Sequence, residues 1–134
     1  MSQENVEVVR RMYDAFHTGD AEGALAHFDP HVIVDASRSG RPDIGIGRGP
    51  EQVRRMVISW VGTWDQWREE IEEMRDLGSQ VLVLTVQHGR GRGSGVEVEA
   101  SYAVLYDLHG GKITRMALYR EPADALAGRS RTGP

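Results

Sequence analysis

The sequence predicts an α+β fold in which helices come first and a mainly antiparallel sheet follows. Three runs rich in β-branched and aromatic residues, at Val81 to Arg90, Val96 to Tyr106 and Lys112 to Tyr119, have the composition of strands. Gly110 and Gly111 separate the last two runs and supply the positive φ of a tight hairpin turn. The first half of the chain instead places apolar residues three and four positions apart, which is typical of amphipathic helices.

The middle strand is expected to be apolar on both faces near its end. Side chains alternate along a strand, so the polar Glu97 and Glu99 share one face with Ala103 and Leu105. The opposite face carries Val96, Val98, Ala100, Tyr102, Val104 and Tyr106. A sheet that is apolar on both faces must be covered on both. Helices can cover one face, and a second subunit or a curled sheet must cover the other. We therefore expect a homodimer joined through the sheet face.

The composition indicates one globular domain. The chain has 134 residues, of which 40% are hydrophobic and 27% charged. It has no Cys, so disulfides, thiolate metal sites and a cysteine nucleophile are excluded. The net charge of -4 argues against a nucleic-acid-binding protein. No apolar run approaches the roughly 20 residues of a membrane span and no signal peptide is visible, so we expect a cytoplasmic protein without a membrane partner.

Two helices are expected at the start of the chain. Apolar residues at helical spacing predict an amphipathic helix from about Glu4 to Thr18, which ends at Gly19. Asp20 is a favourable N-cap for a second, shorter helix over Ala21 to His27. An Asp-Pro dipeptide then ends this helix, because the residue before a proline disfavours the helical conformation.

A strand, a loop and a third helix follow. An apolar triplet predicts a short strand over His31 to Ser37. Ser37 to Gly49 is rich in Arg, Gly and Pro, which is typical of a loop. Pro50 suits the first position of a helix that continues to about Gly62.

The stretch from Trp64 to Leu77 is ambiguous. Its large apolar residues, Trp64, Trp67, Ile71 and Met74, recur at helical spacing, so the stretch taken alone favours a helix.

Little regular structure is expected at the end of the chain. Ala123 to Leu126 predicts a single helical turn, and residues 128–134 are expected to form a flexible tail. The single domain then covers residues 1–127.

Several short motifs in a fixed order carry a resemblance to a known family. In chain order they are Val9 to Phe16, Gly19-Asp20, Ala24 to Phe28, Val32 to Asp35, Gly47 to Glu51 and Asp107 to Ile113. With this order and spacing the chain, over about Glu4 to Ala127, resembles the nuclear transport factor 2-like superfamily, and within it the polyketide-cyclase (SnoaL-like) branch.

The resemblance implies a cystatin-like α+β cone, in which a strongly curved, mainly antiparallel sheet wraps around three N-terminal helices. It also implies an apolar cavity at the open end. The segment after the third helix is a strand in that fold, so we expect a strand over Trp67 to Asp76 despite its helical spacing. Tertiary context can override so weak a local preference.

The steroid isomerases of this superfamily use a Tyr in the first helix, an Asp after the first strand and a protonated Asp on a late strand. The corresponding positions here are Met12, Ala36 and Ala103, with Asp35 one place before the second. That catalytic set is therefore not matched.

The candidate catalytic residues are Asp35, His88 and Tyr102. If Asp35 points toward the mouth of the cone, an apolar surrounding raises its pKa and suits it as a general base. The alternative is a strand-end carboxylate satisfied by loop N–H groups or by Arg38. His88 suits a proton-transfer partner, or else a polar residue on the solvent side of the sheet. Tyr102 suits an oxyanion donor.

Aromatic and small residues are expected to line the cavity, or alternatively to pack the core. They are Tyr13, Phe16, Trp60, Trp64, Ala103 and Tyr119.

The leading hypothesis is a cofactor-independent cyclase, isomerase or hydrolase that acts by general acid-base catalysis on a small hydrophobic substrate. The alternative is a non-catalytic ligand-binding or dimeric scaffold module of the same fold. No metal site is expected, because Pro30 disrupts the helical spacing between His27 and His31. The cluster Glu69 to Glu73 is expected to be a solvated face.

Overall fold

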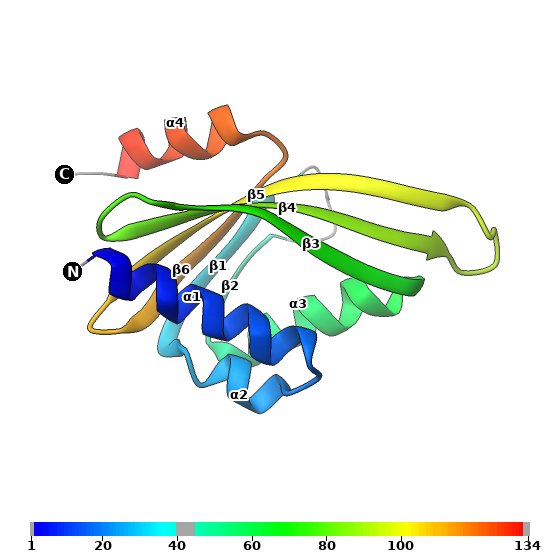
Figure 1. Cartoon of the computed structure of the whole chain (residues 1–134), viewed down its shortest axis with the longest axis horizontal. Helices are drawn as coiled ribbons and strands as arrows, with labels where there is room; N and C mark the ends of the chain where they lie inside the picture. Colours follow the sequence, from blue (N-terminus) through cyan, green and yellow to red (C-terminus); the bar gives the residue numbers. More distant parts are fainter. Residues whose placement is uncertain (1, 40–44, 133–134) are drawn as a thin grey trace.

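In the computed structural model, which describes residues 2–39 and 45–132, helices cover both faces of a single sheet (Figure 1). The helices are α1 (Ser2–His17), α2 (Ala21–Leu25), α3 (Pro50–Gly62) and α4 (Pro122–Thr132). The strands are β1 (Phe28–Arg38), β2 (Ile46–Arg48), β3 (Trp64–Asp76), β4 (Gln80–Gly91), β5 (Glu97–His109) and β6 (Lys112–Tyr119). The predicted α+β class is confirmed. Part of the loop expected over Ser37 to Gly49, residues 40–44, lies outside the described residues.

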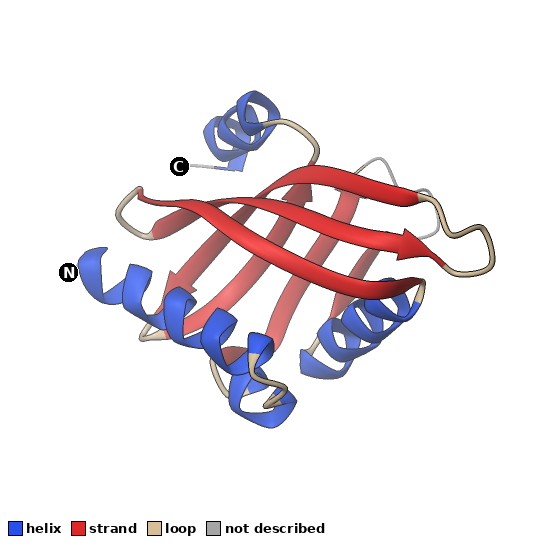
Figure 2. Cartoon of the chain, turned by 45° about the vertical axis from the view of Figure 1, so that its right-hand side comes forward, coloured by secondary structure: helices blue, strands red, loops and turns tan. Residues whose placement is uncertain are grey.

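The six strands form one open sheet in the order β2-β1-β6-β5-β4-β3. Strands β1 and β6 are parallel, and all the other neighbours are antiparallel, so the sheet is mixed but mainly antiparallel. Figure 2 shows it twisted and curved, with α1, α2 and α3 on the inner side and α4 on the outer side. The inner face and the three helices share the main hydrophobic core.

The early elements follow the local sequence signals. Asp20 caps α2, because its carboxylate accepts a hydrogen bond from the Gly23 N–H at 2.9 Å. Pro50 is the first residue of α3, as predicted. Strand β1 begins at Phe28, three residues before the predicted His31, and its pairing with β6 is irregular up to Ile33.

Strand β3 confirms the expectation taken from the resemblance and explains the helical spacing of its apolar residues. Two irregularities in its pairing with β4, between Asp65 and Arg68 and between Ile71 and Glu73, each insert an extra residue. Each insertion shifts the alternation of side chains by one position. A strand with two such bulges therefore turns residues at spacings of three, four and three toward the same face.

Helix α4 covers the apolar part of the outer sheet face. Leu82, Ala103, Leu105, Ala117 and Tyr119 form a second buried cluster with Ala125 of α4. The helix continues to Thr132, whereas the sequence predicted one turn at 123–126 and a tail from residue 128. The homodimer stays a prediction, but its stated reason does not hold, because the chain itself covers this apolar area.

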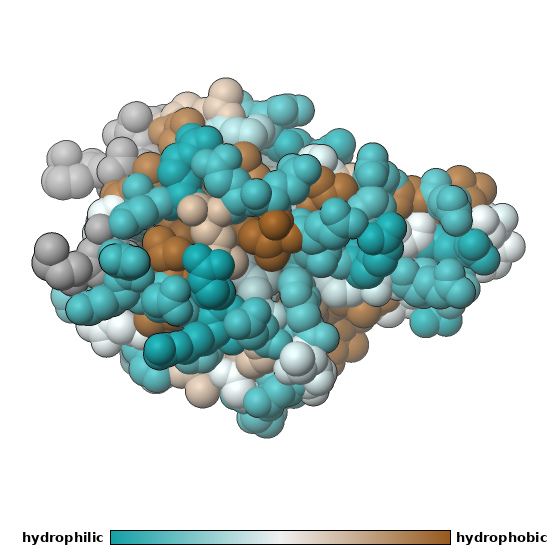
Figure 3. All heavy atoms as spheres, viewed as in Figure 1, coloured by the Kyte–Doolittle hydropathy of each residue, from teal (hydrophilic) through white to brown (hydrophobic). Residues whose placement is uncertain are grey.

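The face of the molecule drawn in Figure 3 is mainly polar. In Figure 3 hydrophilic residues predominate, with small, scattered hydrophobic areas. No helix within residues 2–39 and 45–132 is long and apolar enough to cross a membrane.

Candidate functional site

A cavity of about 150 Å³ lies between the three N-terminal helices and the inner face of the sheet. Its walls are mostly apolar side chains from α1, α2, α3 and strands β1, β3, β5 and β6. The apolar lining residues are Met12, Phe16, Ala21, Ala24, Leu25, Phe28, Val53, Met56, Val57, Ile58, Val104, Met116 and Leu118. A cavity of roughly this volume can hold one benzene-sized ring.

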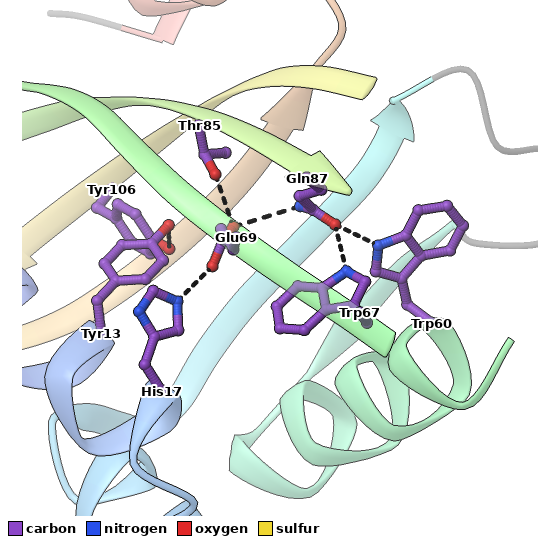
Figure 4. Close-up of polar contacts among 8 residues, drawn as sticks. All are labelled: Tyr13, His17, Trp60, Trp67, Glu69, Thr85, Gln87 and Tyr106. Atoms are coloured by element: carbon purple, nitrogen blue, oxygen red, sulfur yellow. Dashed lines mark hydrogen bonds and ion pairs between the residues drawn. The ribbon is translucent and has the colours of Figure 1, made fainter. Parts of the chain in front are cut away.

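A buried carboxylate forms part of this apolar wall. The Glu69 side chain is only 5% exposed and points inward from β3 (Figure 4). His17 Nε2 lies 2.8 Å from Glu69 Oε1, and the Thr85 hydroxyl donates to Glu69 Oε2 at 2.8 Å. Gln87 Nε2 donates to the same Oε2 at 3.3 Å. A carboxylate has about four acceptor positions, so the vacant one is on Oε1.

The orientation of Gln87 is determined by its neighbours. The indole N–H groups of Trp60 and Trp67 both donate to Gln87 Oε1, at 2.5 and 3.1 Å. An indole N–H can only donate, so the amide nitrogen of Gln87 must face Glu69. A continuous network thus joins two aromatic walls of the cavity to the buried carboxylate (Figure 4).

Two tyrosine hydroxyls meet beside Glu69. Tyr13 of α1 and Tyr106 of β5 are 6% and 0% exposed, and their oxygen atoms are 2.6 Å apart. Burial raises the pKa of both phenols, and the negative charge of Glu69 raises it further. Both hydroxyls therefore stay neutral at physiological pH. One hydroxyl donates to the other, so the second hydroxyl proton has no acceptor among the described residues and can serve a ligand.

Four of the predicted site residues line this cavity. They are Tyr13, Phe16, Trp60 and Tyr102. Trp64 instead packs edge-on against Trp60, with ring centroids 5.2 Å apart, and is not among the lining residues. Its buried indole N–H has no hydrogen-bond partner within the described parts of the chain.

Two other predicted lining residues, Ala103 and Tyr119, lie on the opposite face of the sheet. They are paired neighbours on β5 and β6 and belong to the cluster beneath α4. Their assignment to the cavity is wrong, because strand alternation turns them outward while Tyr102 and Val104 turn inward.

Asp35 also faces outward, so the expected position at the cavity mouth is wrong. Its carboxylate accepts hydrogen bonds from Arg115 at 2.9 Å and from the Ser37 N–H at 3.0 Å. Burial raises its pKa, but the bonds from Ser37 and Arg115 outweigh burial and lower the pKa of Asp35 below its ordinary value. This is the alternative of a satisfied strand-end carboxylate, with Arg115 in the place of Arg38.

His88 is on the outer face as well. Its ring nitrogens lie 3.4 Å from Glu70 and 3.5 Å from Glu99, both exposed carboxylates on the neighbouring strands. Neither Asp35 nor His88 borders the cavity, so the structure does not bring the three predicted catalytic residues together.

The polar residues of the cavity were missed at the sequence level. The acidic cluster predicts a solvated face, which is correct for Glu70 and Glu73, at 58% and 44% side-chain exposure, and wrong for Glu69. Alternation along β3 separates Glu69 from Glu70, and the second bulge, between Ile71 and Glu73, separates it from Glu73. Within the described ranges, no group of three or more His, Asp or Glu side chains is arranged to hold a metal ion.

Comparison with known proteins agrees with this fold. A SnoaL-like domain model matches residues 9–116. An NTF2-like protein from Burkholderia thailandensis is 21% identical with a TM-score of 0.79, covering 96% of this chain and 98% of its own. A putative SnoaL-like polyketide cyclase from Jannaschia is 19% identical with a TM-score of 0.75, covering 98% and 94%.

A third similar structure is that of TerC co-crystallised with polyporic acid. It is 19% identical with a TM-score of 0.76, covering 92% of this chain and 96% of that one. No curated protein matches the sequence. The family model spans most of the chain, and the chain therefore belongs to the SnoaL-like domain family.

Proposed function

We propose that this SnoaL-like domain binds a small, mainly apolar molecule in the cavity and transfers a proton on it without a cofactor. The observation that carries the proposal is the Glu69 carboxylate, 5% exposed in an apolar wall and held by His17. A buried ionisable group with a specific charge partner in a cavity is a candidate for acid-base catalysis.

The step that suits these groups is removal of a proton from a carbon next to a carbonyl. The vacant position on Glu69 Oε1 takes the proton. The electron pair of the broken C–H bond forms a C=C bond, and the π pair of the carbonyl moves to its oxygen. The free hydroxyl proton of the Tyr13–Tyr106 pair donates to that oxygen as its charge develops. Return of the proton from Glu69 to another carbon gives an isomer. Attack of the enolate carbon on a second carbonyl carbon closes a ring, and the alkoxide that forms takes the proton from Glu69.

His17 and Thr85 are positioning groups in this scheme. Both donate to Glu69, and Thr85 is 1% exposed, so the carboxylate has little freedom to rotate. Positioning of this kind lowers the entropy cost of reaching the reactive geometry.

Phenylacetone is a suitable probe for the reaction, because it is neutral, has one ring and carries acidic C–H groups beside a carbonyl. Exchange of those protons for deuterium is followed by NMR. We expect the protein to accelerate exchange and the Glu69→Gln variant to lose at least about 100-fold of that rate, the usual scale of general-base catalysis. The matched control is Glu70→Gln, which changes the adjacent, outward-facing carboxylate at 58% exposure.

The second candidate function is a non-catalytic ligand-binding module. The observation in its favour is that Glu69 and Gln87 already have several hydrogen bonds inside the chain, without a ligand. Quenching of Trp60 and Trp67 fluorescence by phenylacetone without accelerated exchange supports this candidate. Exchange that is equally fast in Glu69→Gln and in the unchanged protein shows that the base assignment is wrong.

A further inference from the structure

We infer that Arg54 binds the carboxylate of the ligand, so the cavity takes a single-ring aromatic or alicyclic carboxylate in preference to the corresponding neutral compound. This inference rests on the proposed binding function of the cavity and adds to it the charge of the ligand and the residue that selects it.

Arg54 supplies the positive charge of the cavity. It lies on α3 and lines the cavity together with Val53 and Val57 from the same helix. Among the described lining residues, Arg54 alone carries a permanent positive charge, and Glu69 alone carries a carboxylate. The two charged groups come from different elements, α3 and β3.

Arg54 is at the exposed end of the cavity. Its side chain is 29% exposed, and its lining neighbour Ile58, one helical turn along α3, is 63% exposed. The Glu69 side chain, which lines the cavity from β3, is only 5% exposed. A ligand can therefore place a charged group beside Arg54, partly in solvent, and an apolar ring toward Glu69. This orientation keeps a ligand carboxylate away from the negative charge of Glu69.

The guanidinium of Arg54 has N–H donors that are available to a ligand. It carries five N–H donors. Its Nε donates to Glu51 at 3.1 Å and its Nη2 donates to Glu22. The other three N–H groups have no acceptor in the described parts of the chain.

The two protein partners of Arg54 compete only weakly with a ligand carboxylate for its guanidinium. The side chains of Glu22 and Glu51 are 81% and 69% exposed, and exposed ion pairs of this kind contribute little. A ligand carboxylate can therefore share or replace them. A planar carboxylate is the anion that matches two parallel N–H donors of a guanidinium.

The experiment compares three probes that differ only in the group on one ring: benzoate, benzamide and benzylamine. Binding is followed by Trp60 and Trp67 fluorescence and by NMR line broadening of the probe. We expect the unchanged protein to bind benzoate about tenfold more tightly than benzamide, the effect of one added charge-assisted hydrogen bond. We expect Arg54→Gln to remove that preference, by weakening the binding of benzoate more than that of benzamide.

The matched control is Arg55→Gln, which changes the neighbouring, exposed arginine that is not a lining residue. It should keep the preference for benzoate. Equal affinity for benzoate and benzamide, tighter binding of benzylamine, or a preference that survives Arg54→Gln would overturn the inference and leave the proposed function standing. If none of the probes binds, the proposed function fails and the inference fails with it.

Discussion

The hydroxyl pair of Tyr13 and Tyr106 allows a sharp test of how this interior is stabilised. Replacing Tyr106 by Phe keeps the ring, which is 0% exposed and packs edge-on against Tyr13 at 6.0 Å, and removes only the hydroxyl. The Tyr13 hydroxyl then loses its one partner among the described residues while it stays 94% buried. A buried polar group left without a partner costs about 1–3 kcal/mol, so we expect the free energy of unfolding to fall by about 1.5 kcal/mol.

The double variant distinguishes this cause from a general loss of packing. Tyr13→Phe alone should cost about as much as Tyr106→Phe, because each leaves the other hydroxyl unpaired. With both replaced, no buried hydroxyl remains, and the cost should be no greater than that of either single variant. The coupling free energy between the two positions is then about 1.5 kcal/mol, well above the ~0.5 kcal/mol error of additivity.

Urea unfolding of the four proteins gives the required free energies. The reasoning fails if the double variant loses the sum of the two single losses, because additive losses would show that each hydroxyl is stabilised independently of the other.

Three further predictions concern other groups. Because the pKa of Asp35 is lowered in the folded state, its contribution to stability is present above the unfolded pKa of about 3.9 and is lost as the pH falls through the lower folded value. Urea midpoints of Asp35→Asn should therefore lie below those of the unchanged protein near pH ~7 and converge with them in acid. Because the pKa of Tyr13 and Tyr106 is raised, an ultraviolet titration to about pH 11 should leave these two tyrosines protonated until the chain unfolds. Ala125→Asp places a carboxylate at a 0% exposed position on the face of α4 that packs against the sheet. It should lower the free energy of unfolding by about 3 kcal/mol or detach the helix, whereas Ala123→Asp, at an exposed position of α4, should change that free energy by less than about 0.5 kcal/mol.

Much of the fold could be predicted because local chemistry decides it. The cap at Asp20, the proline at the start of α3 and the Gly-Gly turn before β6 each have one favourable conformation. The alternating apolar residues of β4 and β5 were likewise sufficient to predict the antiparallel meander. These signals lie within a few residues of one another, so sequence spacing alone carries them.

The candidate site was harder to predict because it depends on which face of the sheet each residue occupies. Tyr102 and Ala103 are adjacent in the chain, yet one lines the cavity and the other packs beneath α4. Asp35 lies within β1, which continues to Arg38, and its position opposite Ala117 on the outer face brings it to Arg115. A register of this kind is set by pairing between strands that are far apart in sequence.

The sequence by itself determined the fold class and the positions of the first three helices, since hydrophobic spacing, caps and turns act locally. The tertiary structure alone decided that Glu69, among several neighbouring acidic residues, is buried against His17. The physical reason is the position of the two bulges in β3. After the first bulge alternation turns Trp67, Glu69 and Ile71 inward, and the second bulge turns Glu73 outward; both positions are set only when β4 pairs beside β3.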